Sequence, residues 1–125
     1  MLARYKMWRG KRPADDPLPD GARMDTRKHT RHCLRPDTDR VKLYLSDPSD
    51  TAWTEFREAY LALLAKRFDE DPSGFDALAE HARGGDVHIG CSCPTTDNPD
   101  VNHCHTVLAL GFMRERYPDL EIVFP

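Results

Sequence analysis

The stretch from Asp86 to Tyr117 constrains the fold most, because a strand pattern, a polar loop and a helix pattern follow one another there. Apolar residues alternate along Asp86–Cys91, as on one face of a strand. Cys104–Tyr117 repeats apolar residues at helical spacing, and Pro118 ends the pattern. A strand followed by a helix favours an open parallel α/β sheet, in which ligands bind beyond the carboxyl ends of the strands.

The rest of the chain supplies further elements of this kind. A long helix is predicted after Ser49, and a short helix is predicted before Gly84-Gly85. Asp39–Leu45 is expected to be a short helix or strand. Leu120–Phe124 is predicted to be a terminal strand, parallel to Asp86–Cys91 and next to it, joined by the helix between them. The apolar face of the long helix consists of Trp53, Phe56, Tyr60, Leu63, Leu64 and Phe68.

At 125 residues the chain is expected to form one small α/β domain, with a parallel sheet flanked by helices. Its net charge of −3 divides into +5 over residues 1–40 and −8 over residues 41–125. We therefore interpret 1–40 as a basic, largely irregular segment packed on an α/β domain formed by 41–125. Residues 11–35 contain several prolines and few apolar residues, so loop is predicted there, with irregular structure or a short helix over 21–40.

The sequence contains no apolar stretch of about 20 residues, and its first residues lack the apolar core of a signal peptide. We therefore expect a cytoplasmic protein without a membrane partner. In that compartment the four cysteines are more typical of thiols, metal ligands or redox groups than of structural disulfides.

Three cysteines and two histidines occur within a window of fifteen residues between the predicted strand and helix. Thiolate and imidazole ligands favour zinc, which takes about four of them. One residue instead of two separates the first two cysteines, so the spacing differs from that of common zinc motifs. The predicted metal ligands are Cys91, Cys93, Cys104, His103 and His105.

Thiol chemistry is the second hypothesis. Cys104 begins a helix, where unpaired N–H groups stabilise a thiolate, so it is a candidate nucleophile with His105 as its proton partner. The same N–H groups could bind the phosphate of a small ligand or cofactor, with Ser92, Thr95, Thr96 and Thr106 as hydroxyl donors. A third interpretation is structural, with the cysteines packed as small apolar residues and the histidines as polar caps.

Two further features concern residues 1–40. Cys33, with His29 and His32, is an additional source of metal ligands, although surface positions in a basic segment are the more ordinary interpretation. The basic residues also make a nucleic-acid partner an alternative, which salt-dependent binding would test. The residues that would contact nucleic acid are Arg23, Arg27, Lys28, Arg31 and Arg35.

Several motifs together resemble the domain of unknown function 488 family. They are Val41–Pro48, Trp53–Phe56 with Tyr60-Leu61, Leu78-Ala79, Gly85–Cys91 and Cys104-His105. The resemblance covers about residues 40–123 and implies a compact α/β domain, but no established activity. Two departures bear on function: Thr106 stands where the family usually has arginine, and Cys93 is an added thiol. The first weakens an analogy to phosphate binding, and the second favours a metal or a disulfide.

We therefore predict a small domain whose cysteine and histidine residues bind a metal, with zinc as the expected ion, or a small ligand. The alternatives are a thiol-dependent enzyme and a nucleic-acid-associated accessory protein.

Overall fold

The central strand of the sheet is β3 (Val87–Cys91), the strand predicted before the cysteine loop. It pairs in parallel with β1 (Leu2–Lys6) on one side and with β2 (Ala22–Asp25) on the other. The order β1-β3-β2 brings the carboxyl ends of all three strands to one edge. This computed structural model describes residues 1–125 and has the predicted α/β class, with a three-stranded parallel sheet and flanking helices.

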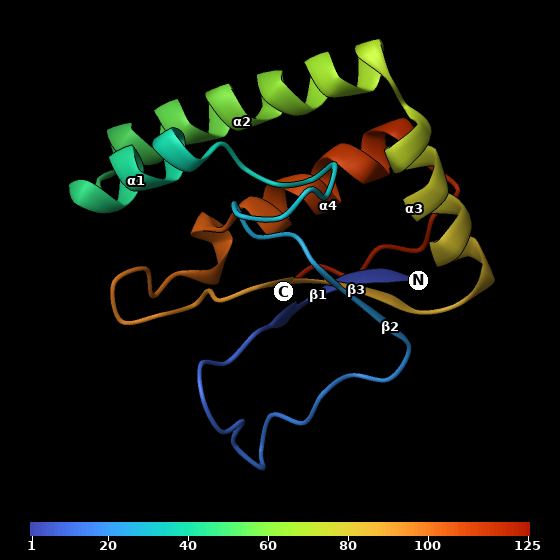
Figure 1. The fold of residues 1–125 in the computed structure, drawn as a ribbon, viewed down its shortest axis with the longest axis horizontal. Coiled ribbons are helices and arrows are strands. Elements are labelled where there is room, and N and C mark those ends of the chain that lie inside the picture. Colours follow the sequence, from blue (N-terminus) through green and yellow to red (C-terminus); the bar gives the residue numbers. More distant parts are fainter.

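Four α-helices lie on one side of this sheet (Figure 1). They are α1 (Thr38–Ser46), α2 (Asp50–Glu70), α3 (Ser73–Gly84) and α4 (His105–Arg116). In Figure 1, α4 runs between the sheet and α2, so the structure has a sheet layer, a middle helix and an outer helix. A short 3₁₀ helix, η1 (Val101–His103), precedes α4.

The core forms between β3 and the apolar faces of the helices. Ser49 caps α2 by accepting a hydrogen bond from the N–H of Ala52 at 3.0 Å. Phe56, Tyr60 and Leu64 then recur at steps of four and are buried against α4. This is the periodicity that predicted the long helix. The packed core holds β3 and α4 in a fixed relation, and so positions the cysteines at their ends.

The first part of the chain contributes more to the sheet than its sequence indicates. The expectation of irregular structure or a short helix over 21–40 is wrong at Ala22–Asp25, which forms β2. Residues 11–35 are otherwise mostly loop. Two of the three strands therefore come from residues 1–40, and Leu2 and Leu34 are fully buried. Short strands with few apolar residues form here because β3 supplies a buried partner on each edge.

The strand predicted at Leu120–Phe124 and its placement beside β3 are also wrong, because only Ile122 in this segment forms a β-bridge. This segment is not a neighbour of β3, because β1 and β2 occupy both edges of that strand. It lies instead beside β1, where a single parallel bridge joins Ile122 to Leu2. The N–H of Val123 donates to the carbonyl of Leu2, and the N–H of Leu2 donates to the backbone carbonyl of Glu121.

Candidate metal centre

The structure brings the three predicted cysteines of the loop together. The Sγ atoms of Cys91, Cys93 and Cys104 all lie within 4.8 Å of one another. Cys91 is the last residue of β3, Cys93 follows two residues later, and Cys104 precedes α4. The predicted meeting of strand end and helix start at the carboxyl edge of the sheet thus occurs. All three cysteines are free thiols.

The loop between these elements has its own local order. The N–H groups of Thr95 and Asn98 each donate to the other residue's carbonyl, at 3.0 and 3.2 Å, which closes a short turn. Asp100 caps η1 by accepting from the N–H of Asn102 at 2.9 Å. Cys104 is then extended, with φ −127° and ψ 141°, before the chain enters α4. Because Cys104 is extended, its side chain and that of His105, the first residue of α4, can approach the same region. Consecutive side chains within a helix would instead diverge.

Hydrogen-bond donors surround the sulfurs. Asn98 Nδ2 donates to Cys93 Sγ at 3.3 Å, and the Thr106 hydroxyl donates to Cys104 Sγ at 3.1 Å. Arg4 Nε donates to Thr106 Oγ1 at 2.8 Å, and the Arg4 guanidinium also donates to the Cys93 carbonyl. A cation and two donors therefore surround sulfur atoms that become anionic when deprotonated, and these contacts favour thiolate.

The pKa values of the three thiols are shifted by their closeness to one another. The pKa of Cys93 lies far below its usual value because the neighbouring Cys104 and Cys91 thiols and the Asn98 amide stabilise its thiolate. The pKa of Cys91 is raised by the neighbouring Cys104 and Cys93 sulfurs and by burial. Contact with Cys91 favours the Cys104 thiolate, but Cys93 and burial outweigh it, and the pKa of Cys104 is raised. Cys93 is thus the preferred position for a single negative charge in the metal-free cluster.

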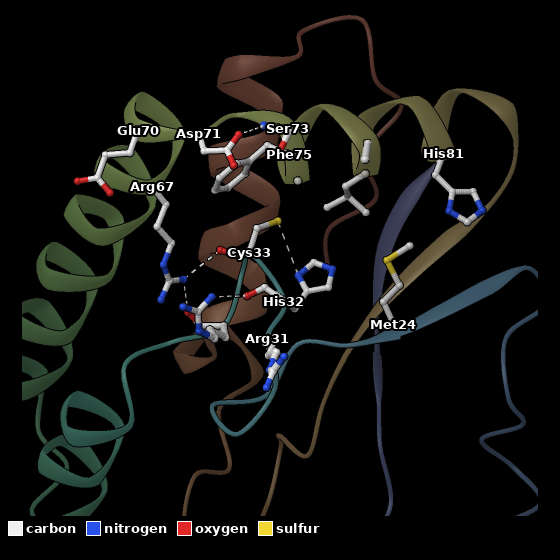
Figure 2. Close-up of a pocket in the computed structure, with 14 residues that line it drawn as sticks. Met24, Arg31, His32, Cys33, Arg67, Glu70, Asp71, Ser73, Phe75 and His81 are labelled. Carbon is white, nitrogen blue, oxygen red and sulfur yellow. Dashed lines mark hydrogen bonds between the residues drawn. The ribbon is translucent and has the colours of Figure 1, made fainter.

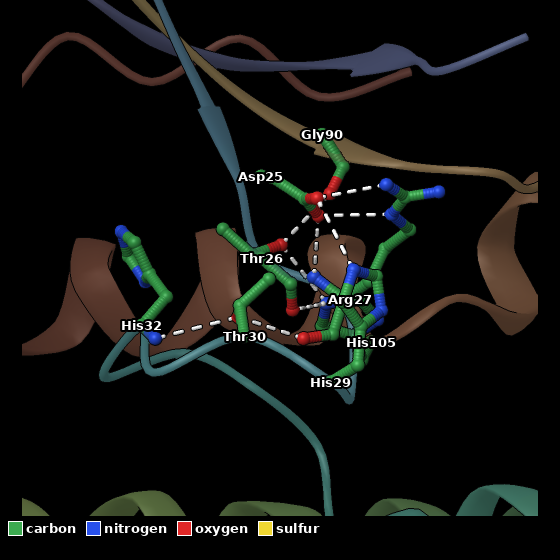
Figure 3. Close-up of polar contacts among 8 residues, drawn as sticks. All are labelled: Asp25, Thr26, Arg27, His29, Thr30, His32, Gly90 and His105. Atoms are coloured by element: carbon green, nitrogen blue, oxygen red, sulfur yellow. Dashed lines mark hydrogen bonds and ion pairs between the residues drawn. The ribbon is translucent and has the colours of Figure 1, made fainter.

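The His105 imidazole lies beside this cluster in a fixed orientation. Its Nε2 contacts Thr26 (Figure 3), at 2.9 Å from the carbonyl oxygen and 3.0 Å from the hydroxyl oxygen. A carbonyl oxygen only accepts, so Nε2 carries the proton and Nδ1 has the free lone pair. This Nδ1 is 4.0 Å from Cys104 Sγ. Burial lowers the pKa of His105 to about 4, so the ring is neutral at pH 7.

Thr26 is held in turn by β3. Its hydroxyl donates to the carbonyl of Gly90 at 3.0 Å, one residue before Cys91, and its N–H donates to the same oxygen. The contact links the end of β2 to β3 and to the start of α4 (Figure 3). A second link from sheet to helix runs through Arg4 of β1 and Thr106. All three strands thus contribute to the geometry around the sulfurs.

His103, the other predicted histidine ligand, is not part of the three-cysteine group. Its ring stacks on Trp53 with centroids 4.8 Å apart, and its Nδ1 lies 3.3 Å from the Tyr44 hydroxyl. Its backbone carbonyl accepts from Asn98 Nδ2 at 2.8 Å. His103 therefore packs against the aromatic residues of α1 and α2, and its main chain helps to position the loop.

Ser92 and Thr106, two of the predicted hydroxyl donors, differ in accessibility. Ser92 is partly exposed and lines the cavity next to the sulfurs. Thr106 is fully buried, and both hydrogen-bonding roles of its hydroxyl are used by Cys104 and Arg4. Ser92 is thus free to contact a ligand, whereas Thr106 acts on Cys104.

The fourth cysteine lies elsewhere. Cys33 lines a separate cavity with Arg67 and His32, formed between α2 and α3 (Figure 2). Burial raises the pKa of Cys33 to about 11. Its Sγ is 3.8 Å from His32 Nδ1, and its carbonyl accepts from Arg67 at 3.0 Å. Cys33 and His32 therefore add no ligand to the three-cysteine group.

A cavity of about 580 Å³ is lined by all three cysteines, of which only Cys93 is partly exposed. It lies at the carboxyl edge of the sheet, where the residues after β1, β2 and β3 meet. Its lining includes Cys91, Cys93, Cys104 and His105, together with residues of α1 and α2. A small molecule in this cavity would therefore lie next to the cysteines and could contact Cys93, as in a ligand-binding site rather than a sealed core.

Of the basic residues predicted to meet nucleic acid, Arg27 pairs with Asp25 at 2.8 Å. Arg23 and Arg35 donate to the backbone carbonyls of Pro19 and His32. Lys28 and Arg31 take part in none of the ion pairs of the protein. The structure gives no support to a nucleic-acid interface at these positions. No helix has both the length and the apolar character needed to cross a membrane.

Sequence reasoning missed three residues that shape the site. Asn98 stands in a loop whose turn was not predicted, and its exposed fraction is only 6%. Arg4 and Thr26 belong to or follow strands that were not predicted. An Asn-Pro pair inside a polar loop was the one available signal for Asn98, since such pairs favour turns.

Comparison with known proteins adds no identity to this geometry: no family model matches the chain, and neither curated proteins nor solved structures give a match. The resemblance to the domain of unknown function 488 family therefore stays a prediction.

Proposed function

We propose that Cys91, Cys93 and Cys104 bind one thiophilic divalent ion, with Zn²⁺ as the expected ion, and that the cavity admits a small ligand to it. The observation that carries this proposal is the approach of three sulfurs to within 4.8 Å. Zinc–sulfur bonds of ~2.3 Å at tetrahedral angles place sulfurs roughly 3.8 Å apart. The three side chains would need to close by about an ångström at most, within the reach of rotamer adjustment.

Charge supports the same assignment. Three thiolates and one divalent ion leave a net charge of −1, which needs compensation in a buried site. The Arg4 guanidinium acts on the site through Thr106 and the Cys93 carbonyl, while Asn98 donates directly to Cys93. Such outer contacts orient ligands and tune their basicity in metal sites. Packing alone gives no reason for this set of donors around apolar thiols.

Three protein ligands beside an open cavity are typical of metal sites that bind a ligand or substrate, since structural zinc sites are usually closed by four. We leave His105 outside the ligand set because its Nδ1 approaches only Cys104, at 4.0 Å. In the metal-free protein this neutral nitrogen can accept the Cys104 S–H, which keeps that thiol aimed at the cluster. His105 is thus a positioning residue here.

The test is a titration of the metal-free, reduced protein with Co²⁺, which gives a near-ultraviolet thiolate charge-transfer band. We expect saturation at one ion per chain and displacement of the band by Zn²⁺. Cys91→Ser, Cys93→Ser and Cys104→Ser should each weaken binding and reduce the band. Cys33→Ser is the matched control, because it removes a thiol outside the group and should change neither. No saturable band, or equal losses in all four variants, would contradict the proposal.

The thiol-enzyme alternative has one specific observation in its favour, and it concerns Cys93 rather than Cys104. Cys93 is partly exposed with a lowered pKa, whereas Cys104 has an exposed fraction of 2% and a raised pKa. If thiol chemistry occurs in the metal-free protein, we therefore propose Cys93 as the attacking sulfur. Limited alkylation followed by peptide mass spectrometry should label Cys93 first. First labelling at Cys104 would favour the original assignment of Cys104 with His105.

A further inference from the structure

The cavity above the three cysteines is lined by far more positive than negative charge. Lys6, Arg9, Arg27 and Lys28 line it, whereas Asp97 is the only carboxylate among its lining residues. The whole protein has a net charge of −3, so this excess of cations is local. Because cavity walls focus the field of their charges, such a lining favours the entry of anions.

Most of these cations have no carboxylate partner. Arg27 is committed to Asp25 through two hydrogen bonds of 3.0 and 2.8 Å. Lys6, Arg9 and Lys28 take part in none of the ion pairs of the protein. Lys6 Nζ lies 3.7 Å from the centre of the Trp8 ring, which holds the ammonium at the cavity without neutralising it. Three positive charges are therefore available to a ligand.

The lining contributed by α1 and α2 is different in character. It consists of Val41, Tyr44, Leu45, Trp53 and Phe56, and is apolar and largely aromatic. Tyr44 and Trp53 pack edge to face at 5.5 Å, and Trp53 stacks on Phe56 at 5.4 Å, so these rings support one another. The cavity thus combines an apolar lining from the helices, a basic lining from the chain after β1 and β2, and sulfur atoms.

We propose that the cavity binds a small anion, a carboxylate or a phosphate monoester, that carries an aromatic or apolar body. Arg9, Lys28 and Lys6 hold the anionic group, and the body lies against the aromatic residues of α1 and α2. This inference deepens the proposed function, and rests on it for placing the ligand next to the metal. The cations and aromatic side chains that select the anion belong to the protein and do not depend on the metal.

Tryptophan fluorescence can test this directly, because Trp8 and Trp53 are the only two tryptophans and both line the cavity. The probes are phenyl phosphate, benzoate, inorganic phosphate and neutral benzyl alcohol, added to the zinc-loaded protein with excitation at the red edge of tryptophan absorption. We expect saturable changes with at least one of the aryl anions, weaker binding of inorganic phosphate, and none with benzyl alcohol at equal concentration. Comparison of the two aryl anions identifies the preferred anionic group.

The double variant Arg9→Gln with Lys28→Gln should weaken binding of the preferred aryl anion by about tenfold or more. Its matched control is Lys42→Gln with Arg57→Gln, which removes two exposed cations of α1 and α2 outside the cavity and should change affinity little. Thermal unfolding checks that both variants are folded. Absence of saturable aryl-anion binding, or equal affinity in the two variants, would overturn the inference, as would equal binding of benzyl alcohol.

The same titration on metal-free Cys91→Ser protein separates the two proposals. If Co²⁺ titration fails but aryl anions bind with the expected dependence on Arg9 and Lys28, the metal proposal is wrong and anion recognition stands. If Co²⁺ binds at one ion per chain and no aryl anion binds, the metal proposal stands and this inference is wrong.

Discussion

Replacing Thr106 by valine removes one hydroxyl at a fully buried position while keeping its volume. The wild-type hydroxyl accepts from Arg4 Nε at 2.8 Å and donates to Cys104 Sγ at 3.1 Å. Loss of a hydrogen bond with a charged partner costs about 1.5–3 kcal/mol, and loss of a weaker one about 0.5–1.5 kcal/mol. We therefore expect Thr106→Val to lower the free energy of unfolding by about 2–4.5 kcal/mol.

Urea denaturation of the metal-free, reduced protein measures this change. Thr106→Ser is the matched control, because it keeps the hydroxyl and loses one buried methyl group, worth about 1 kcal/mol. A double-mutant cycle with Arg4→Met should show that the two losses are not additive, since both substitutions break the same contact. If Thr106→Val costs no more than Thr106→Ser, or if the losses add, the hydroxyl does not link β1 to α4 as described.

Two further predictions concern pH and the backbone. The pKa of His105 is lowered by burial from 6.5 to about 4, so the unfolded state binds more protons between these values and stability is lost as pH falls through this window. In the metal-free protein the free energy of unfolding should fall by about 3 kcal/mol across this window. Urea denaturation at a series of pH values should show a smaller fall in His105→Gln. Identical pH profiles of the two proteins would contradict the buried neutral ring. Gly21 and Gly10 both have positive φ, 93° and 75°, but only at Gly21 would a Cβ collide with the backbone, at the Asp86 carbonyl. Gly21→Ala should therefore lower the thermal midpoint clearly more than Gly10→Ala, and equal effects would show that β2 is not fixed by this close approach.

The parts of the fold that could be predicted are those with local signals. Phe56, Tyr60 and Leu64 recur at helical spacing, and apolar residues alternate along Val87–Cys91. The helix α2 and the strand β3 could therefore be predicted from residues close together in the sequence. The strands β1 and β2 could not be predicted in this way, because they pair with residues more than sixty positions away along the chain. Leu120–Phe124 has a strand-like composition, yet only Ile122 bridges to the sheet, since the edges of β3 are already occupied.

The same distinction between local and distant signals holds for the residues of the candidate site. The cysteines could be placed from sequence because a strand end and a helix start meet at the carboxyl edge of a parallel sheet. The roles of Arg4 and Asn98 could not, because they depend on β1 pairing and on the turn of a polar loop. The separation of His103 from the sulfurs follows from its stacking on Trp53, a contact between distant segments. The composition of residues 1–40 could not show which cations are paired: Arg27 is paired with Asp25, whereas Lys28 takes part in no ion pair.

X-ray absorption of the zinc-loaded protein tests the central claim most directly, since it counts the sulfur atoms bound to the metal. We expect three Zn–S contacts at ~2.3 Å and one nitrogen or oxygen ligand. Cys33→Ser should give the same spectrum, whereas loss of any one of Cys91, Cys93 and Cys104 should leave two sulfurs or no bound metal. A first shell with no sulfur, or one that needs Cys33, would contradict the assignment of these three cysteines as the metal centre.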